Sequence, residues 1–520
     1  MNMNSVQILI SMSLYIVLVV GIGVYYAKRA NENPDNYFLG GRSLGPWVAA
    51  MSAEASDMSG WLLMGLPGVA YWCGLADATW TAVGLAIGTY INWRLVAKRL
   101  RHYSQVAGNS ITIPQFFSNR FKENKKVIMM IAALFILVFF TVYAASCFVT
   151  CGKLFSALFG LDYQLMMIIG AVFVIIYTFL GGFLAESSSD FIQGIVMILA
   201  LVLVLITGTI AAGGPAAIFN NVKEFPGFLE FFGIAQPKVA DGLQQVANGV
   251  PQFGAAGSYG ILTILSTLSW GLGYFGMPQV LLRFMAIRRS SELKKSRIIA
   301  TSWCVISLAA AVAIGVIGRA LYPTELLTSG AAENIFIVLS TNLLPPLIAG
   351  VVMSGILAAT MSSSDSYLLI ASSAFAKDAF KGVFKKDATN KQVMTLSRIT
   401  LLLIALFGII IALDENSVIF TVVSFAWAGF GATFGPLMLF SLFWKRINRA
   451  GAIAGMLAGG GMVFLWKLVL KPIGGVFGIY ELLPAFVVSC IVIVVVSLLT
   501  QKPSGEIEQE FELAKAMQEE

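Results

Sequence analysis

The sequence predicts an all-α protein that crosses a membrane many times, and three observations lead to this fold class. Apolar residues make up 58% of the 520-residue chain, and charged residues make up only 12%. Apolar runs of about 20 residues, the length that a helix needs to cross a bilayer, recur from one end of the chain to the other. Two of these runs are interrupted by glycine and proline, which is typical of transporters built from inverted repeats.

The composition also excludes other classes of protein. The 34 basic residues exceed the 27 acidic ones, but the excess lies in loops between apolar runs, so we expect no nucleic-acid partner. The five cysteines are odd in number and lack paired spacing, which argues against a disulfide framework or a metal site. The single histidine, His102, lies in a basic loop, and we do not expect an enzyme. Nothing indicates an obligate protein partner.

The first apolar run, residues 6–27, is a retained helix and not a signal peptide. It has no basic region before it and no small-residue cleavage site after it, and Lys28 and Arg29 follow directly. With the runs that follow, about thirteen spans are predicted. They lie near residues 6–27, 46–72, 76–97, 127–158, 162–185, 188–213, 258–285, 297–322, 345–376, 394–413, 418–443, 449–470 and 477–500.

The charges of the loops predict the orientation of the chain. The loops 94–126, 283–297, 377–398 and 445–449 are basic, whereas the alternate loops are neutral or acidic. Basic loops face the cytoplasm, so thirteen spans place the N-terminus outside and the C-terminus inside. The acidic tail 501–520 is expected to form an amphipathic cytoplasmic helix.

The first interrupted run, SAEASDMSGWLLMGLPG at 52–68, contains Asp57 near its centre. A carboxylate at membrane depth is unfavourable by at least a few kcal/mol, so such a residue indicates function. Gly60, Gly65 and Pro67 weaken the helix around it. Non-helical backbone at this depth persists only inside protein or along a cavity. We therefore expect a site for a small cation; the alternative is a kinked helix whose Asp57 pairs with a neighbour.

The second interrupted run, SWGLGYFGMPQ at 269–279, supplies the aromatic residues Trp270, Tyr274 and Phe275. Each interrupted run opens a series of five spans, and because five is odd the second series starts from the opposite side of the membrane. This predicts a 5+5 inverted repeat, although close packing of helices through glycine is the alternative. The predicted parts are 1–45, a first helix and loop; 46–213, the first repeat; 214–257, an outer loop of short helices; 258–443, the second repeat; 444–500, two further helices; and 501–520, the tail.

The ninth span contains AATMSSSDS at 358–366. Helical spacing puts Ser362, Asp365 and Ser366 on one face, with Ser363 beside it. Such a set of oxygen ligands suits an alkali cation. The alternative is that the serines bond to carbonyls of their own helix. Asp190, near the predicted start of the sixth span, is either a helix cap or part of an ion path.

Three long blocks carry a resemblance to a known family. They are GGRSLGPWVAAMSAEASDMSGWLLMGLPG at 40–68, SWGLGYFGMPQVLLRFMA at 269–286 and FAWAGFGATFGPLMLFSLFWKR at 425–446. The chain resembles the sodium/solute symporter family from about residue 37 to 499, and is most similar to its proline-transporting branch. The resemblance implies a leucine-transporter-type fold and sodium-coupled import of L-proline across the bacterial inner membrane by alternating access. The alternative solute is pantothenate, a sugar or a carboxylate.

The resemblance also implies roles for single residues. The sodium ion, which is co-transported and is not a catalytic cofactor, would be held by Ala55, Met58, Ala359, Ser362 and Ser363, with Asp57 essential for coupling. The substrate would contact Ser59, Gly60, Tyr143, Trp270, Tyr274 and Pro278. Arg42 and Asp190 would lie on the inner sodium pathway, and Asp365 with Ser366 would belong to a second sodium site or to that pathway.

Two residues depart from the family pattern. Glu54 stands where a small residue is usual, and no role is assigned to it. Asp365 stands where some relatives have a hydroxyl at a second sodium site. The stoichiometry therefore stays open between one sodium ion and two.

Overall fold

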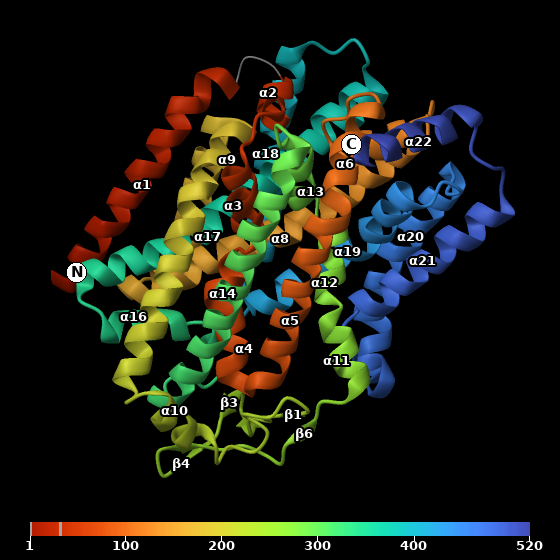
Figure 1. Cartoon of the computed structure of the whole chain (residues 1–520). Helices are drawn as coiled ribbons and strands as arrows, with labels where there is room; N and C mark the ends of the chain where they lie inside the picture. The colour runs from red at the N-terminus through yellow and green to blue at the C-terminus, as the bar shows by residue number, and fades with distance from the viewer. Residues whose placement is uncertain (1–2, 31–33, 520) are drawn as a thin grey trace.

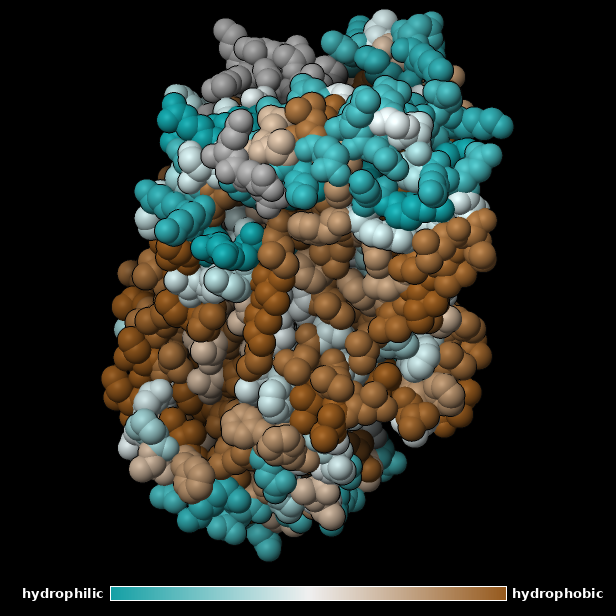
Figure 2. All heavy atoms as spheres, turned by 45° about the vertical axis from the view of Figure 1, so that its right-hand side comes forward, coloured by the Kyte–Doolittle hydropathy of each residue, from teal (hydrophilic) through white to brown (hydrophobic). Residues whose placement is uncertain are grey.

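The computed structural model describes residues 3–30 and 34–519. Long helices lie side by side, with α1 on one flank and α20 and α21 on the other, and the few short strands gather at one end (Figure 1). On the face shown in Figure 2, a broad hydrophobic band separates two hydrophilic ends. A helical bundle with such a band fits a membrane protein, because backbone polar groups within lipid must be satisfied inside the helices.

Nine helical segments among the described residues are long and apolar enough to cross a membrane. They belong to α1 (Met3–Ala30), α8 (Val127–Phe159), the second part of α9 (Tyr163–Ala211), α14 (Leu293–Leu321), α17 (Pro346–Ser373), α18 (Asn390–Ile411), α19 (Ile419–Phe443), α20 (Arg449–Leu465) and α21 (Leu482–Leu499). Each of the other four predicted spans also contains helix, but in shorter pieces. Helix length alone therefore does not establish the predicted count of thirteen.

Three of those four spans are interrupted. The span at 46–72 consists of α3 (Pro46–Asp57), the π-helical turn η2 (Trp61–Gly65) and α4 (Leu66–Cys73). The span at 76–97 is α5 (Leu75–Ile91), which runs through a second π-helical turn, η3 (Asn92–Val96), into α6 (Ala97–Val106). The span at 258–285 is divided into α11 (Ile261–Leu268), α12 (Trp270–Gly273), η4 (Tyr274–Gly276) and α13 (Pro278–Ala286). Both predicted breaks are thus present.

The chain reverses direction inside α9, at Gly182. The hydroxyls of Tyr177 and Ser189 lie 2.7 Å apart, whereas twelve residues of unbroken helix would span about 18 Å. Gly182 has φ 58° and ψ −174°, a conformation that residues with a side chain rarely adopt. The predicted turn between residues 185 and 188 is therefore placed slightly too late. Asp190 lies about two helical turns into the second arm and not at its start.

The loop 214–257, which is predicted to lie outside, is only partly helical. It contains α10 (Pro215–Val222), and the rest forms short antiparallel strand pairs, the last of which ends just beyond the loop. These pairs are β1 (Gly233–Ile234) with β6 (Gly257–Ser258), β2 (Val239–Ala240) with β3 (Leu243–Gln244), and β4 (Val246–Ala247) with β5 (Val250–Pro251). The expectation of short helices is right for α10 alone, because the Gly- and Gln-containing remainder forms two tight hairpins, β2–β3 and β4–β5, between the paired strands β1 and β6.

The remaining short helices lie outside the long bundle segments. They are α2 (Pro34–Leu39), α7 (Ile113–Arg120), α15 (Ser329–Ala332) and α16 (Ile335–Leu343). The acidic tail forms the predicted helix, α22 (Gly505–Glu519), and the guanidinium of Arg99 in α6 lies 4.8 Å from the centre of the Phe511 ring in α22. The division into two repeats, 46–213 and 258–443, stays a prediction.

Candidate functional site

The two helix breaks lie in the buried centre of the molecule. Met58 ends α3 with φ −88° and ψ 79°, and Met277 separates η4 from α13 with φ −78° and ψ 108°. Residues Ala49–Asp57 of α3 and all residues of α13 are buried. Pro278 occupies the first position of α13, where its missing N–H is not needed by the helix. Each break therefore exposes backbone polar groups to the protein interior and not to lipid.

A group of oxygen atoms joins the first break to α17. The Ser362 hydroxyl lies 2.7 Å from the Ala55 carbonyl oxygen and 3.2 Å from that of Ala359. The Ser363 hydroxyl lies 3.3 Å from the same Ala55 oxygen. All four residues are fully buried. Four of the predicted sodium ligands thus lie together, and hydroxyl and carbonyl oxygens are ligands that suit a hard cation.

The other predicted sodium residues lie differently. Met58 is at the end of α3, where its sulfur is 3.9 Å from the Ser307 hydroxyl of α14. Asp57 is fully buried, and neither oxygen of its carboxylate has a hydrogen-bond partner among the described residues. The polar side chains beside this carboxylate are those of Tyr274 and Gln279. The Asp57 side chain therefore faces the second broken helix, whereas the carbonyl oxygen of Ala55 faces α17.

Aromatic rings surround the two breaks. Trp270 stacks on Tyr480 with 5.1 Å between ring centres. Tyr143 stacks on Tyr367 at 4.3 Å, and its hydroxyl lies 3.4 Å from the Asp57 carbonyl oxygen. Tyr274 meets the edge of Trp427 at 5.1 Å. The predicted substrate residues Tyr143, Trp270 and Tyr274 thus belong to aromatic pairs that line the centre of the bundle.

The predicted substrate residues Ser59 and Gly60 follow the first break directly. The Ser59 hydroxyl is buried and has no hydrogen-bond partner in the described part of the chain. A Cβ at Gly60 would lie 2.3 Å from the Thr150 hydroxyl oxygen of α8. The absence of a side chain at Gly60 thus lets α8 approach the break closely, and its predicted contact with the substrate stays a prediction.

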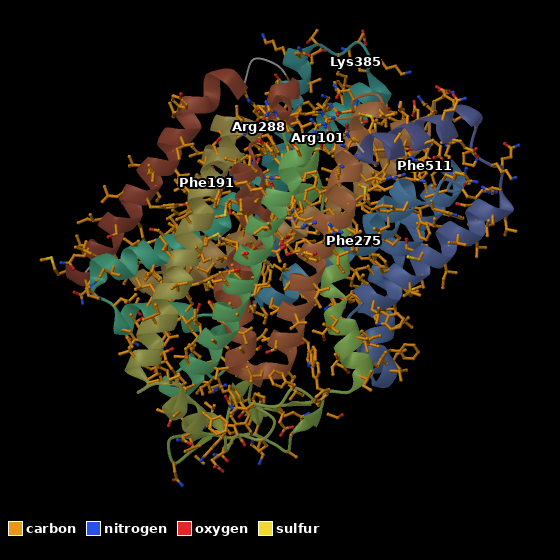
Figure 3. All side chains as sticks on the ribbon, viewed as in Figure 1. Arg101, Phe191, Phe275, Arg288, Lys385 and Phe511 are labelled. Carbon is orange, nitrogen blue, oxygen red and sulfur yellow. The ribbon has the colours of Figure 1, made fainter. Side chains whose placement is uncertain are left out.

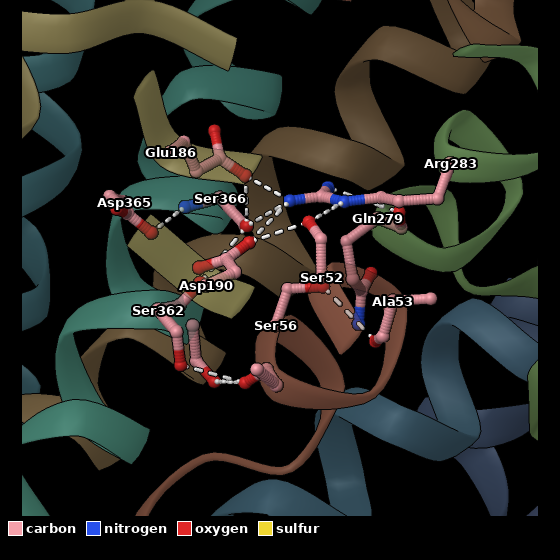
Figure 4. Close-up of polar contacts among 12 residues, drawn as sticks. Ser52, Ala53, Ser56, Glu186, Asp190, Gln279, Arg283, Ser362, Asp365 and Ser366 are labelled. Carbon is pink, nitrogen blue, oxygen red and sulfur yellow. Dashed lines mark hydrogen bonds and ion pairs between the residues drawn. The ribbon is translucent and has the colours of Figure 1, made fainter. Parts of the chain in front are cut away.

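A buried charged network lies beside the breaks (Figure 4). The guanidinium of Arg283 in α13 pairs with Glu186 and, at 3.2 Å, with Asp190, both in α9. Arg283 also donates to Ser366 over 3.0 Å and to Ser52 over 2.9 Å. The arginine thus joins α3, α9, α13 and α17, and it neutralises part of the buried negative charge.

This network includes part of the predicted second sodium site. Ser366 donates to Glu186, and its backbone N–H donates to Asp365 over 2.8 Å. Asp190 accepts from Ser52 over 2.6 Å. Among the described residues no group of three or more His, Cys, Asp or Glu side chains is arranged to hold a metal ion. Arg283 supplies the cation that contacts Glu186 and Asp190 in this structure.

Sequence reasoning missed Arg283, Glu186 and Gln279. The sequence predicts Arg283 at the edge of a basic loop and Glu186 at the start of the sixth span, without a role for either. Gln279 ends the interrupted run at 269–279, in which no role is predicted for its amide. An ionisable or amide side chain so close to a break in an apolar run is the signal that could have identified each of them.

Arg42 belongs to a different group of contacts from Asp190. Its guanidinium donates to the carbonyl oxygens of Met285 over 2.7 Å and Ser110 over 2.6 Å. Burial, with a contribution from the positive charge of Arg101, lowers the pKa of Arg42 to about 10. Arg101 reaches the same end of α13 and donates to the Ile287 carbonyl oxygen over 2.7 Å (Figure 3). The two arginines thus bind the C-terminal end of α13, at the basic end of the bundle.

Comparison with known proteins gives a consistent result. The model of the "Sodium:solute symporter family" matches residues 37–459. Sodium/proline symporters of Staphylococcus aureus strains USA300 / TCH1516 and JH9 are each 42% identical over 508 residues, which is 96% of this chain and 94% of theirs.

Solved structures share the fold. A Na⁺-coupled sialic acid symporter in a substrate-bound outward-open state has a TM-score of 0.75 and 19% identity, covering 96% of this chain and 99% of its own. MhsT in complex with L-phenylalanine has a TM-score of 0.53 and 14% identity, covering 87% and 97%. These similarities confirm the predicted class, an all-α membrane protein of the leucine-transporter type, without fixing the number of spans.

Proposed function

Because this chain belongs to the sodium:solute symporter family, we propose that it couples the entry of sodium to the import of L-proline by alternating access. The observation that carries this proposal is the meeting of Ala55, Ala359, Ser362 and Ser363 at the first helix break. It supplies hard oxygen ligands at a break, which is where transporters of this architecture bind their coupling ion.

Sodium in this group would bridge the end of α3 to α17. Ala55 lies two residues before Asp57, so the ion would order the same stretch of backbone that borders the aromatic residues. Ordering this stretch would raise the affinity for substrate, and by thermodynamic reciprocity the substrate would raise the affinity for sodium. Such coupling typically amounts to about 1–3 kcal/mol.

The substrate assignment rests on the relatives and on the aromatic centre. Sodium/proline symporters match this chain over 96% of its length, which favours L-proline over pantothenate, a sugar or a carboxylate. Proline has a compact apolar ring, and Tyr143, Trp270 and Tyr274 offer flat apolar surfaces beside the polar breaks. Aromatic faces also attract a cationic ammonium group.

Alternating access would move α3–α4, α5 and α11–α14 against the rest of the bundle. At the basic end, Arg42 connects the end of α13 at Met285 to the loop at Ser110, and these contacts would close the path from the breaks to this end. Opening towards that end requires these contacts to separate. We place this end in the cytoplasm of a bacterial inner membrane, with the N-terminus outside and the C-terminus inside, because it carries the basic loops.

The test is uptake of labelled L-proline into proteoliposomes with an inward sodium gradient, compared with choline in place of sodium. We expect uptake that requires sodium and that is lost in Asp57→Asn. Equal uptake without sodium would contradict the coupling. Sodium-stimulated uptake of another solute, without proline uptake, would keep the family and reject the substrate.

A further inference from the structure

Gln279 is a buried amide without a hydrogen bond to any described residue. Its side chain is fully buried, and neither its oxygen nor its nitrogen has a hydrogen-bond partner in the part of the chain that the structure describes. Burying an amide without hydrogen bonds is unfavourable. Gln279 is the second residue of α13, directly after the break at Met277. An unsatisfied group at this position calls for an explanation.

Two further unsatisfied groups lie next to it. The Tyr274 hydroxyl and both carboxylate oxygens of Asp57 also lack hydrogen-bond partners among the described residues. The side chains of Tyr274 and Gln279 are the polar neighbours of the Asp57 carboxylate. The two broken helices therefore bring a carboxylate, a phenol and an amide together, and leave all three without aligned hydrogen bonds.

Asp57 differs in this respect from the other buried carboxylates of the described chain. Glu186 and Asp190 both form ion pairs with Arg283. Glu54 is 3.4 Å from the indole nitrogen of Trp93. Asp57 alone among them has two unsatisfied oxygens and no basic partner. A carboxylate in this state is complementary to a ligand that brings a positive charge.

The chemistry of the three groups matches the head group of an amino acid. An ionised carboxylate only accepts hydrogen bonds, whereas the Gln279 amide and the Tyr274 hydroxyl can donate them. The N-terminal end of α13 adds a partial positive charge beside Gln279. The secondary ammonium of proline has two N–H groups for Asp57, and its carboxylate can accept from Gln279 and Tyr274.

We propose that Asp57, Tyr274 and Gln279 bind the head group of the imported amino acid, with Asp57 on the ammonium and Gln279 on the carboxylate. This rests on the proposed function and adds Gln279 as a residue that determines specificity. It assigns the Asp57 side chain to the substrate and leaves sodium to the oxygens around Ala55 and Ser362. Asp57 is two residues from Ala55, so sodium and the amino acid would order the same helix break.

The test compares L-proline with L-prolinamide, which keeps the ring and the ammonium but has no carboxylate. Both are used as competitors of labelled proline uptake, in the wild type and in Gln279→Leu. We expect the substitution to lower the affinity for proline by about 10- to 100-fold, which is the range for the loss of a hydrogen bond to a charged group. The affinity for prolinamide should change less than about threefold. The ratio of the affinities for proline and prolinamide should therefore fall sharply. The sodium concentration for half-maximal uptake, measured at saturating proline, should stay unchanged.

Gln193 in α9 provides a matched control, because it is also fully buried and both of its amide atoms lack partners among the described residues. Gln193→Leu should keep the wild-type ratio of proline to prolinamide. If Gln279→Leu is too slow to assay, the same ratio is read from ligand-induced shifts of the melting temperature of the purified protein.

The matched probe for Asp57 is tetrahydrofuran-2-carboxylate, in which oxygen replaces the ammonium of proline. Because Asp57→Asn is expected to lose uptake, its ligands are compared by the shifts that they induce in the melting temperature of the purified protein. Asp57→Asn should weaken the binding of proline more than the binding of this analogue. A wild type that imports proline with sodium, together with a Gln279→Leu variant that keeps the wild-type discrimination, would overturn the inference and leave the proposed function standing. A wild type that takes up no proline would reject the proposed function, and the head-group assignment with it.

Discussion

The Ser362 hydroxyl donates a hydrogen bond to the Ala55 carbonyl oxygen over 2.7 Å, between residues that are 307 positions apart in the chain. This bond connects α17 to the last turn of α3. Its acceptor, Ala55, lies two residues before Asp57. A hydroxyl has one proton and two lone pairs, so it can donate to the carbonyl or turn its lone pairs to a cation. The same two oxygens can therefore hold the break together with or without an ion.

Ser362→Ala removes one of these oxygens, and we expect it to weaken sodium binding. The sodium concentration for half-maximal proline uptake should rise about tenfold or more, which corresponds to about 1.4 kcal/mol. The measurement is uptake into proteoliposomes as a function of sodium. Ser364 is the matched control, because it is fully buried but bonds to the Thr360 carbonyl of its own helix over 2.6 Å. An equal shift in Ser364→Ala would remove the specific role of Ser362.

Gly271→Ala is expected to separate two helices. A Cβ at this position would lie 2.2 Å from the Gly84 carbonyl oxygen of α5, which is backbone and cannot turn aside. Overpacking of this kind typically destabilises a protein by about 1–3 kcal/mol. The apparent melting temperature in detergent should fall. In the control, Gly461→Ala in α20, the new methyl group meets nothing within 4 Å. Alanine favours helix by about 1 kcal/mol there, so a fall in both variants would contradict the packing argument.

The breaks in the helices could be predicted from the sequence because their causes are local. Glycine and proline in an apolar run weaken a helix wherever they occur. The common face of Ser362 and Ser366 follows from helical spacing. The prediction that Ala55 and Ser362 lie together rests on the family resemblance, because no local sequence pattern specifies a contact between distant segments.

Other features depend on packing and could not be read in this way. The turn predicted between residues 185 and 188 lies a few residues after the actual reversal at Gly182, because this reversal occurs inside an otherwise unbroken helical stretch. The sequence predicts Arg283 as part of the basic loop that follows it, because its partner Glu186 lies 97 positions earlier in the chain. The position of Asp57 beside Gln279 likewise depends on how the two broken helices cross, which neither sequence segment specifies by itself.

Glu333→Gln is expected to destabilise the end of the bundle opposite the basic loops. Glu333 accepts from Lys153 over 2.7 Å and from the backbone N–H groups of Ile419 and Phe420, each over 2.9 Å. It thus neutralises a buried lysine and caps α19. Breaking a buried pair from one side typically destabilises by about 3–5 kcal/mol. The measurement is the apparent melting temperature in detergent. The control is Glu325→Gln, at an exposed residue of the same region, where a change within about 0.5 kcal/mol is expected.

Arg283→Gln is expected to destabilise the protein because it leaves Glu186 and Asp190 buried without their cation. The loss should be about 3–5 kcal/mol, seen as a lower melting temperature. Adding Glu186→Gln should recover part of it, since one of the two unpaired carboxylates is then neutral, and this recovery is the sign of a charge effect. Arg288→Gln is the control, because its pair with Glu292 is exposed and contributes at most about 1 kcal/mol. A double variant less stable than Arg283→Gln alone would mean that Arg283 acts through packing against its neighbours and not through charge.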